Sequence, residues 1–213
     1  QVAYAAGSGV SLKGNNNTVT NCIIHDINSY GHYLGGVHTE GDGHQITHNT
    51  IYNSGRDIID HNESSNLKIM YNNLYNSGLQ TQDGAITYAW GNEVGSGGEI
   101  AYNLIHDAHA IPYNSRAVVG VYLDDHVSNY LVHHNVIWNI GSSGDSAFGI
   151  DFHNPQTGHD YAYNNTIWNV DDLAVAVITD GNDCPTECNV YNNLSDKSFY
   201  GGTDVKNNLL TSN

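Results

Sequence analysis

Two adjacent carboxylates, Asp124 and Asp125, follow an apolar segment within the stretch GVYLDDHVSNYLVHHNVIWN, which begins at Gly120. Paired carboxyl groups can act as general acid and base when their surroundings separate their pKa values. Glycoside hydrolysis uses such a pair, about 5 to 5.5 Å apart for retention and about 6.5 to 9.5 Å apart for inversion. Which other acids could join this pair depends on the residues that the fold places beside it.

One short motif recurs along the chain as TVTNCIIHD, QITHNTIYN, KIMYNNLYN, EIAYNLIHD, LVHHNVIWN and YAYNNTIWN. It reads apolar, x, x, Asn, x, Ile or Leu, aromatic or His, Asn or Asp. Successive copies are roughly 23 to 32 residues apart, and repeats of this length indicate a solenoid, because one unit cannot bury its own apolar face. The anchor position of the motif holds Cys22, Asn49, Asn72, Asn103, Asn135 and Asn165.

The repeated units have the composition of strands. They are rich in Asn, Gly, Val, Ile and Tyr, and their apolar residues alternate over short runs. Each unit has a second strand-like segment after a Gly- or Ser-containing loop, and a third short strand before the anchor residue. We therefore predict an all-β chain, a parallel β-helix of about seven or eight coils over residues 1–213, either a single domain or a fragment of a longer protein. The anchor Asn residues are expected to form a hydrogen-bonded ladder.

The motif N-x-[IL]-x-[ND], with the segments GLQTQDGAITYAWG and GVYLDDHVSNYLVHHNVIWN, resembles the right-handed parallel β-helix superfamily of carbohydrate-active proteins. This superfamily includes pectate lyases, polygalacturonases and secreted β-helix repeat proteins. The resemblance covers nearly the whole chain. It implies a right-handed coil, secretion to the extracellular space, a polysaccharide partner, and a substrate cleft along the strand after the longest loops. YLDD beside GIDFHN is similar to the three aspartates of polygalacturonases, whose GHG and RIK motifs are absent here.

In such a fold, equivalent residues of successive coils lie about 4.8 Å apart and form columns. We take Val37, Ile58, Ala85, Val121, Ile150 and Val177 as equivalent inward positions. Alternation then predicts that the next residues face outward, namely His38, Ile59, Ile86, Tyr122, Asp151 and Ile178. The following outward column is entirely titratable, with Glu40, His61, Tyr88, Asp124, His153 and Asp180.

These columns define the candidate site. Crowded carboxylates raise one pKa, as a general acid requires, and we predict the catalytic set Asp124, Asp151 and Asp180. Substrate would be bound by Glu40, His38, His61, Tyr88, Tyr122, Asp125, His153 and Arg116. The leading hypothesis is hydrolysis of a neutral or weakly charged polysaccharide, with no cofactor and no metal ligand. An exposed polar face without chemistry is the alternative for this column.

Two other functions stay open. A polysaccharide lyase could use Tyr88, Tyr122, His61 or His153 as its base, with Arg56 and Arg116 at the uronate and Ca²⁺ as an optional bridge to it. A non-catalytic adhesive protein could instead stack its coils end to end into fibres, since β-helix ends expose unpaired strand edges. A second outward column, with His25, Tyr52, Tyr75, His106, Trp138 and Trp168, could bind sugar rings but is more readily explained as stacking between coils.

Composition limits the partners. The chain has 6 basic and 22 acidic residues and a formal charge of −16, so nucleic acid and anionic membranes are not expected as partners. No apolar run approaches the roughly 18 residues of a membrane span. Of the three cysteines, Cys184 and Cys188 in DCPTEC could form a disulfide, while Cys22 is expected to be a buried thiol.

Overall fold

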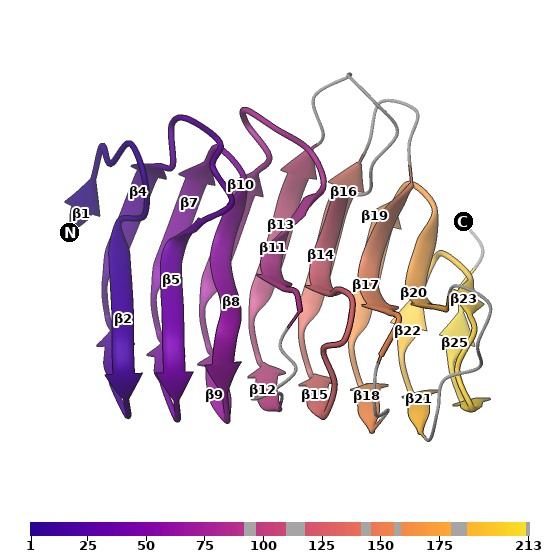
Figure 1. Cartoon of the computed structure of the whole chain (residues 1–213). Helices are drawn as coiled ribbons and strands as arrows, with labels where there is room; N and C mark the ends of the chain where they lie inside the picture. The colour runs from indigo at the N-terminus through magenta and orange to yellow at the C-terminus, as the bar shows by residue number, and fades with distance from the viewer. Residues whose placement is uncertain (92–96, 110–117, 142–145, 156–158, 180–186, 212–213) are drawn as a thin grey trace.

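The computed structural model describes residues 1–91, 97–109, 118–141, 146–155, 159–179 and 187–211. Within these ranges the secondary structure is entirely β, in three parallel sheets that share one elongated stack (Figure 1). Neighbouring strands in each sheet are three apart in chain order, so each coil gives one strand to every sheet. No helix in the described ranges has the length and apolar character needed to cross a membrane.

We call the nine-stranded sheet A and the two eight-stranded sheets B and C. Sheet A contains β1 (Val2–Ala3), β4 (Ile23–Ile27), β7 (Thr50–Ser54), β10 (Asn73–Ser77), β13 (Leu104–His109), β16 (Val136–Gly141), β19 (Thr166–Val170), β22 (Leu194–Ser195) and β25 (Leu209–Leu210). Sheet B contains β2 (Val10–Asn15), β5 (Gly35–Asp42), β8 (Asp57–Ser65), β11 (Gly84–Ala89), β14 (Val118–Leu123), β17 (Ala147–His153), β20 (Leu173–Ile178) and β23 (Phe199–Tyr200). Sheet C contains β3 (Thr18–Thr20), β6 (Gln45–Thr47), β9 (Leu67–Met70), β12 (Gly98–Ala101), β15 (Tyr130–His133), β18 (Asp160–Tyr163), β21 (Cys188–Tyr191) and β24 (Asp204–Lys206).

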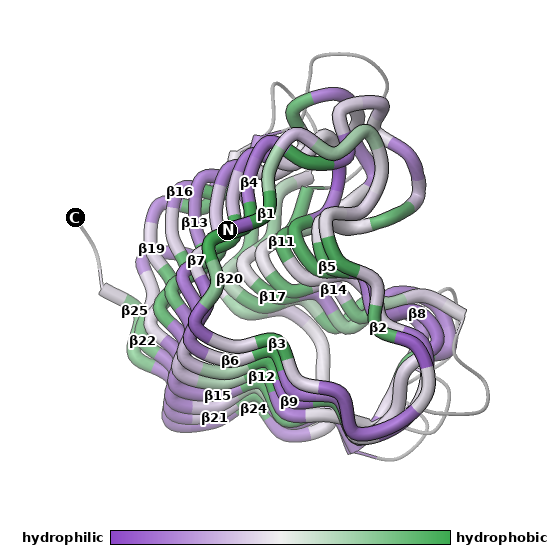
Figure 2. The backbone as a smooth tube through the Cα atoms, turned by 90° about the vertical axis from the view of Figure 1, so that its left-hand side faces the viewer, coloured by the Kyte–Doolittle hydropathy of each residue, from purple (hydrophilic) through white to green (hydrophobic). Residues whose placement is uncertain are grey.

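The coils lie almost over one another when the chain is viewed from its N-terminal end (Figure 2). The core is a column of aliphatic side chains inside these coils. In sheet A, Ile51 pairs with Ile24 and Leu74, and Leu74 pairs with Ile105. All four side chains are fully buried. The apolar position of each repeat therefore stacks on its equivalent, which confirms the predicted parallel β-solenoid.

The anchor Asn ladder is also confirmed. The Asn72 side-chain amide donates to the Ile46 carbonyl at 2.8 Å and to Asn103 Oδ1 at 3.0 Å, and that same oxygen accepts the Asn72 backbone N–H at 2.9 Å. Each rung thus satisfies backbone groups that would otherwise be buried without partners. The same pattern is repeated at Asn49, Asn103, Asn135, Asn165 and Asn193, and Asn208 accepts the last rung.

The last position of the motif is Asn or Asp for a backbone reason. These residues adopt φ values between 53° and 62°, the left-handed region that Asn and Asp tolerate better than other non-glycine residues. Their side chains form a second ladder, in which Asn53 donates to Asp26 at 2.8 Å and Asn76 donates to Asn53 at 2.6 Å. A further run begins at Asp107, which accepts from Asn139 at 2.9 Å.

The predicted register of sheet B was wrong in three coils. Val37 pairs with Ile59, where Ile58 was predicted. Ile59 in turn pairs with Thr87, where Ala85 was predicted. Ile150 pairs with Val175, two residues before the predicted Val177. The runs DIID and AVAV carry apolar residues at neighbouring positions, so alternation alone does not fix their register, and the pairing also shifts between His38 and Glu40.

The corrected outward column of sheet B is His38, Asp60, Tyr88, Tyr122, Asp151 and Ala176. Ile59 and Ile86, which were predicted to face outward, belong to the core. His61, also predicted outward, points into the interior, where it is fully buried and its Nδ1 lies 3.1 Å from the Tyr130 hydroxyl. Burial lowers its pKa to about 4, so it is neutral in the folded chain at neutral pH.

Cys188 is disulfide-bonded, and its predicted partner Cys184 lies outside the described residues. Cys22 is a free thiol that is half-buried rather than buried, because it closely follows β3, the edge strand of sheet C. Its backbone N–H still donates to Asn49 Oδ1 at 2.9 Å, so this coil joins the ladder only as a donor.

Candidate functional site

A pocket of about 630 Å³ opens on the outer face of sheet B, where β11 and β14 end. Ligand pockets in proteins are commonly about 300 to 1,000 Å³. A small apolar cluster that includes Ala85, Val119 and Phe148 packs against Tyr88 and Tyr122 on this face. The pocket is lined by Tyr33, Asn62, Asp83, Tyr88, Trp90, Tyr122, Asp124 and Asp125.

Asp124 follows β14 directly and is only 9% exposed. Its Oδ2 accepts the Tyr88 hydroxyl at 2.9 Å, and its Oδ1 accepts the Asp125 backbone N–H at 2.9 Å. Burial raises the pKa of Asp124, and these two donors oppose that effect only in part. Asp124 therefore has the surroundings of a carboxyl group that can hold and release a proton.

Asp125 stands beside Asp124 in different surroundings. It is half-exposed, and its Oδ1 accepts the Asn154 side-chain amide at 2.7 Å. Asp125 is accessible to solvent, whereas protein covers Asp124. The adjacent acids thus combine one buried and one solvated carboxyl group in the same pocket.

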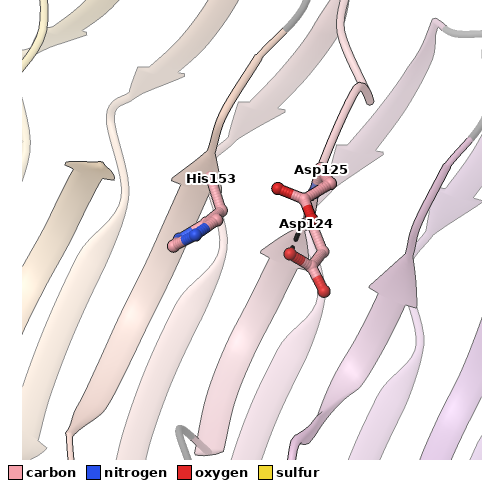
Figure 3. Close-up of side chains that lie close together, drawn as sticks. All are labelled: Asp124, Asp125 and His153. Atoms are coloured by element: carbon pink, nitrogen blue, oxygen red, sulfur yellow. Dashed lines mark hydrogen bonds between the residues drawn. The ribbon is translucent and has the colours of Figure 1, made fainter. Parts of the chain in front are cut away.

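Asp151 and His153 come from β17, the next strand of sheet B (Figure 3 draws His153 with the aspartate pair). Asp151 is 1% exposed, pairs with Tyr122 and lies outside the pocket lining. Its Oδ2 is 3.7 Å from His153 Nδ1. Burial raises the pKa of Asp151 to about 6, and the Asp151 carboxylate raises the pKa of His153 to about 9. His153 is therefore a cation at neutral pH, held by a carboxylate beneath the pocket.

Asp124, Asp125 and His153 also form a possible metal-ligand group. One ligand atom from each lies within 4.8 Å of the other two (Figure 3). Carboxylates with an imidazole suit a divalent transition metal better than Ca²⁺, which prefers oxygen ligands alone. A bound metal would have to displace the proton that His153 carries at neutral pH. No metal ligand was predicted from the sequence.

Arg56 packs against two of the aromatic side chains that line the pocket. Its guanidinium carbon lies 4.2 Å from the centre of the Tyr33 ring and 4.6 Å from that of Tyr88. Its Nη1 donates to Asp57 Oδ2 at 3.1 Å, and its Nη2 donates to the Asp83 carbonyl. Arg56 is 2% exposed, so it orients aromatic rings from two other coils rather than presenting its charge to solvent.

His38 and Glu40 form a separate cluster closer to the N-terminus. His38 Nδ1 lies 3.1 Å from Asp60 Oδ2 and its Nε2 lies 3.0 Å from Glu40 Oε1, while Lys13 is 2.7 Å from the same Glu40 oxygen. The Asp60 carboxylate, followed by that of Glu40, raises the pKa of His38 to about 9. Neither His38 nor Glu40 lines the pocket.

The structure therefore brings together part of the predicted site. Tyr88, Tyr122, Asp124 and Asp125 line one pocket, with Asp151 and His153 behind it. Asp180 and Arg116 lie outside the described residues. Sequence reasoning missed four lining residues, although the segment GLQTQDGAITYAWG contains two of them; the four are Tyr33, Asn62, Asp83 and Trp90.

The fold and the site define an extended parallel β-solenoid with a lateral pocket on one sheet. A family model described as a right-handed β-helix region matches residues 1–160. The chain belongs to this right-handed β-helix family, as its sequence motif predicts. Comparison with curated proteins and with solved structures finds no match.

Proposed function

We propose that this chain is an extracellular polysaccharide-binding protein that hydrolyses glycosidic bonds in the sheet B pocket. The right-handed β-helix fold is consistent with polysaccharide-related proteins. The observation that carries the proposal is the pair of carboxyl groups, one buried and one solvated, in a pocket that four aromatic side chains also line. Aromatic faces pack against the apolar faces of sugar rings, and the carboxyl pair supplies acid and base.

Asp124 is assigned as the general acid. Its pKa is raised because the side chain is buried, so the carboxyl group is more readily protonated and can protonate the departing glycosidic oxygen. The Tyr88 hydroxyl donates to Asp124 Oδ2 at 2.9 Å and fixes its orientation. After proton transfer, that hydrogen bond stabilises the Asp124 carboxylate.

Asp125 is assigned as the partner carboxylate. An oxygen of Asp125 lies no more than 4.8 Å from an oxygen of Asp124, so the pair is too close for the wide spacing of inverting enzymes. Asp125 would attack the anomeric carbon to form a covalent glycosyl ester, which water then cleaves with Asp124 acting as base. Asp151 takes the role of a positioning residue that keeps His153 protonated beside the pair.

The lyase alternative is weaker in this pocket. Elimination needs a base, but burial raises the pKa of Tyr88 and Tyr122, each above its already high ordinary value. His61 lies in the core, and His153 is already protonated at neutral pH.

The fibre-forming alternative predicts no activity and end-to-end association of the purified chain.

A screen of plant, algal and microbial polysaccharides tests the proposal, with reducing ends and the unsaturated product of elimination measured separately. On a substrate found this way, Asp124→Asn should lower kcat about 10²- to 10⁴-fold, the usual contribution of general acid catalysis. Asp125→Asn should be similarly slow, and azide should restore turnover by forming a glycosyl azide. The product formed by the wild-type chain should retain the anomeric configuration, as read by NMR.

Asp172→Asn is the matched control, because Asp172 is exposed and lies outside the pocket lining. It should leave kcat unchanged. Full activity in both Asp124→Asn and Asp125→Asn would refute the assignment. Unsaturated product in the same amount as new reducing ends would establish the lyase, because elimination frees one of each, and fibres without turnover on any substrate would establish the structural role.

A further inference from the structure

Two adjacent histidines at the end of β15 bring their ring nitrogens together on sheet C. His133 is the last residue of β15, and His134 begins the turn that follows. Their Nδ1 atoms lie 2.8 Å apart, and their rings are nearly perpendicular, at 85°. His133 is buried and His134 is exposed, so the pair reaches the surface. Neither histidine lines the sheet B pocket, so this cluster is separate from the candidate site.

The backbone of His134 allows the two imidazoles to meet. Consecutive side chains of an extended strand point to opposite faces, but His134 leaves the strand conformation with a φ of 53°. The next three coils have Asn at the equivalent position, with φ values of 54° or 55°, at Asn164, Asn192 and Asn207. The turn therefore does not itself require a histidine.

Neighbouring side chains fix the orientation of both rings. His133 Nε2 lies 3.1 Å from Glu99 Oε1, and a carboxylate only accepts hydrogen bonds, so neutral His133 carries its proton on Nε2. Its Nδ1 lone pair thus faces His134. Tyr163 stacks on the His133 ring at 4.7 Å, and Tyr102 stacks on the His134 ring at 5.0 Å. An imidazole held by a carboxylate on one nitrogen and open on the other is the usual state of a metal-binding histidine.

The separation of the two Nδ1 atoms favours one coordination geometry. Two imidazole nitrogens bound at about 2.0 Å to one metal are about 2.8 Å apart at a right angle, and roughly 3.3 Å apart at the tetrahedral angle. The observed 2.8 Å matches adjacent positions of a tetragonal site. Such sites favour Cu²⁺ or Ni²⁺ over Zn²⁺, and Cu²⁺ binds nitrogen ligands most tightly of these ions. The formal charge of −16 also attracts a cation to the chain.

We propose that His133 and His134 form a Cu²⁺ site in which their two Nδ1 atoms are adjacent ligands and water fills the remaining positions. Glu99 stays on His133 Nε2 and holds that ring in place. His134 binds with its proton on Nε2, where the Asn164 side chain, at 3.3 Å, turns its oxygen to accept that proton. Both imidazoles are therefore neutral ligands. The site is independent of the proposed hydrolysis.

Titration of the metal-free chain with Cu²⁺ tests the site, with affinity measured by calorimetry and ligation by electron paramagnetic resonance. The first equivalent of Cu²⁺ should show coupling to two imidazole nitrogens and should bind more tightly than Zn²⁺. The group of Asp124, Asp125 and His153 has a single imidazole. The number of coupled nitrogens therefore distinguishes the two positions.

His134→Asn is the diagnostic variant, because Asn164 occupies the equivalent turn of the next coil with a φ of 55°. The substitution removes one ligand and keeps the turn, so Cu²⁺ affinity should fall at least tenfold, the two-nitrogen signal should disappear, and Tm without metal should hardly change. His48→Asn is the matched control, since His48 has a φ of 57° in the same column but follows Thr47 instead of a second histidine. It should leave Cu²⁺ binding unchanged. Glu99→Ala removes the outer carboxylate and should weaken binding about tenfold.

Four results would overturn the inference. Unchanged affinity in His134→Asn, or a two-nitrogen signal that survives this substitution, would show that the pair is not the ligand set. An equal fall in His48→Asn would show unspecific binding by surface histidines. Loss of the first equivalent in His153→Ala but not in His134→Asn would place the metal in the sheet B pocket. Tighter binding of Zn²⁺ than of Cu²⁺ would contradict the tetragonal geometry.

Discussion

Aromatic side chains behave in opposite ways on two faces of this solenoid. On sheet A, the Tyr75 ring lies 4.8 Å from Tyr52 at an interplanar angle of 3°, and 4.8 Å from His106 at 6°. On sheet B, Tyr88 and Tyr122 also belong to adjacent coils, but their rings meet edge to face at 73°. Identical coil geometry thus supports a closed stack on one face and an open arrangement on the other.

The difference follows from what the rings cover. In the sheet A stack each ring covers the face of the next, so few faces remain for a sugar, and the rings chiefly stabilise contacts between coils. This supports the stacking explanation of that column. In sheet B the two rings meet edge to face, and both line the pocket beside Asp124 and Asp125. The regularly stacked side chains of sheet A belong to the scaffold, whereas the candidate site lies where the rings of sheet B depart from that stacking.

The largest expected effect comes from breaking the regular region. Asn103→Ala would leave the Ile69 carbonyl and the Asn72 backbone N–H buried without partners. At about 1 to 3 kcal/mol for each unsatisfied group, the loss is about 3 kcal/mol. For a chain of this size that corresponds to a fall in Tm of roughly 6 to 12 °C, measurable by circular dichroism.

Asn189→Ala is the control for this prediction, because the half-buried Asn189 lies on β21, next to the edge strand of sheet C, where its side chain accepts a hydrogen bond from Thr203 at 3.0 Å. It should lower Tm by no more than about 3 °C. Equal Tm values for Asn103→Ala and Asn189→Ala would show that the ladder does not stabilise the interior as inferred. Glycan affinity per folded molecule should be the same in both variants.

The contrast between the two faces also explains what the sequence could predict. In the repeat, each residue lies over its own equivalent, so one aligned motif predicts the Asn72 to Asn103 hydrogen bond and the ring stack together. In sheet B the register depends on coil lengths and on runs such as AVAV, which fit in more than one position. That ambiguity misplaced Ile58 and Val177 and put His61 on the wrong face.

The missed pocket residues had no periodic signal at all. Tyr33 comes from the connection between β4 and β5, and Arg56, from the following coil, packs over its ring at 4.2 Å. Contacts of this kind join segments that no local pattern relates. Asp124 and Asp125 were found because their residue types suggested chemistry, whereas Trp90 lies outside the repeated motif.

Replacing Trp90 and Trp168 separately tests whether glycan binds on sheet B rather than on sheet A, with an expected effect smaller than that of Asn103→Ala. Trp90 lines the pocket and is 53% exposed, while Trp168 continues the sheet A column and is 38% exposed. Trp90→Ala should weaken glycan binding about tenfold, near 1.4 kcal/mol, with little change in Tm. Trp168→Ala should leave binding unchanged and cost roughly 0.2 to 1 kcal/mol in stability. Weakened binding in Trp168→Ala alone would place the glycan on sheet A.

The smallest effect concerns a single hydroxyl group. Tyr88→Phe removes the donor to Asp124 Oδ2, and this hydrogen bond lowers the Asp124 pKa against the opposing effect of burial. Without it the pKa rises, so the general acid stays protonated to higher pH and the alkaline limb of kcat moves upward, by about 0.5 to 1 pH unit. Tyr122→Phe is the control. Tyr122 is the residue that pairs with Tyr88 in the neighbouring coil, but the hydroxyl that donates to Asp124 Oδ2 is that of Tyr88. A downward shift, or the same shift in both variants, would mean that Asp124 is not the group that must be protonated for turnover.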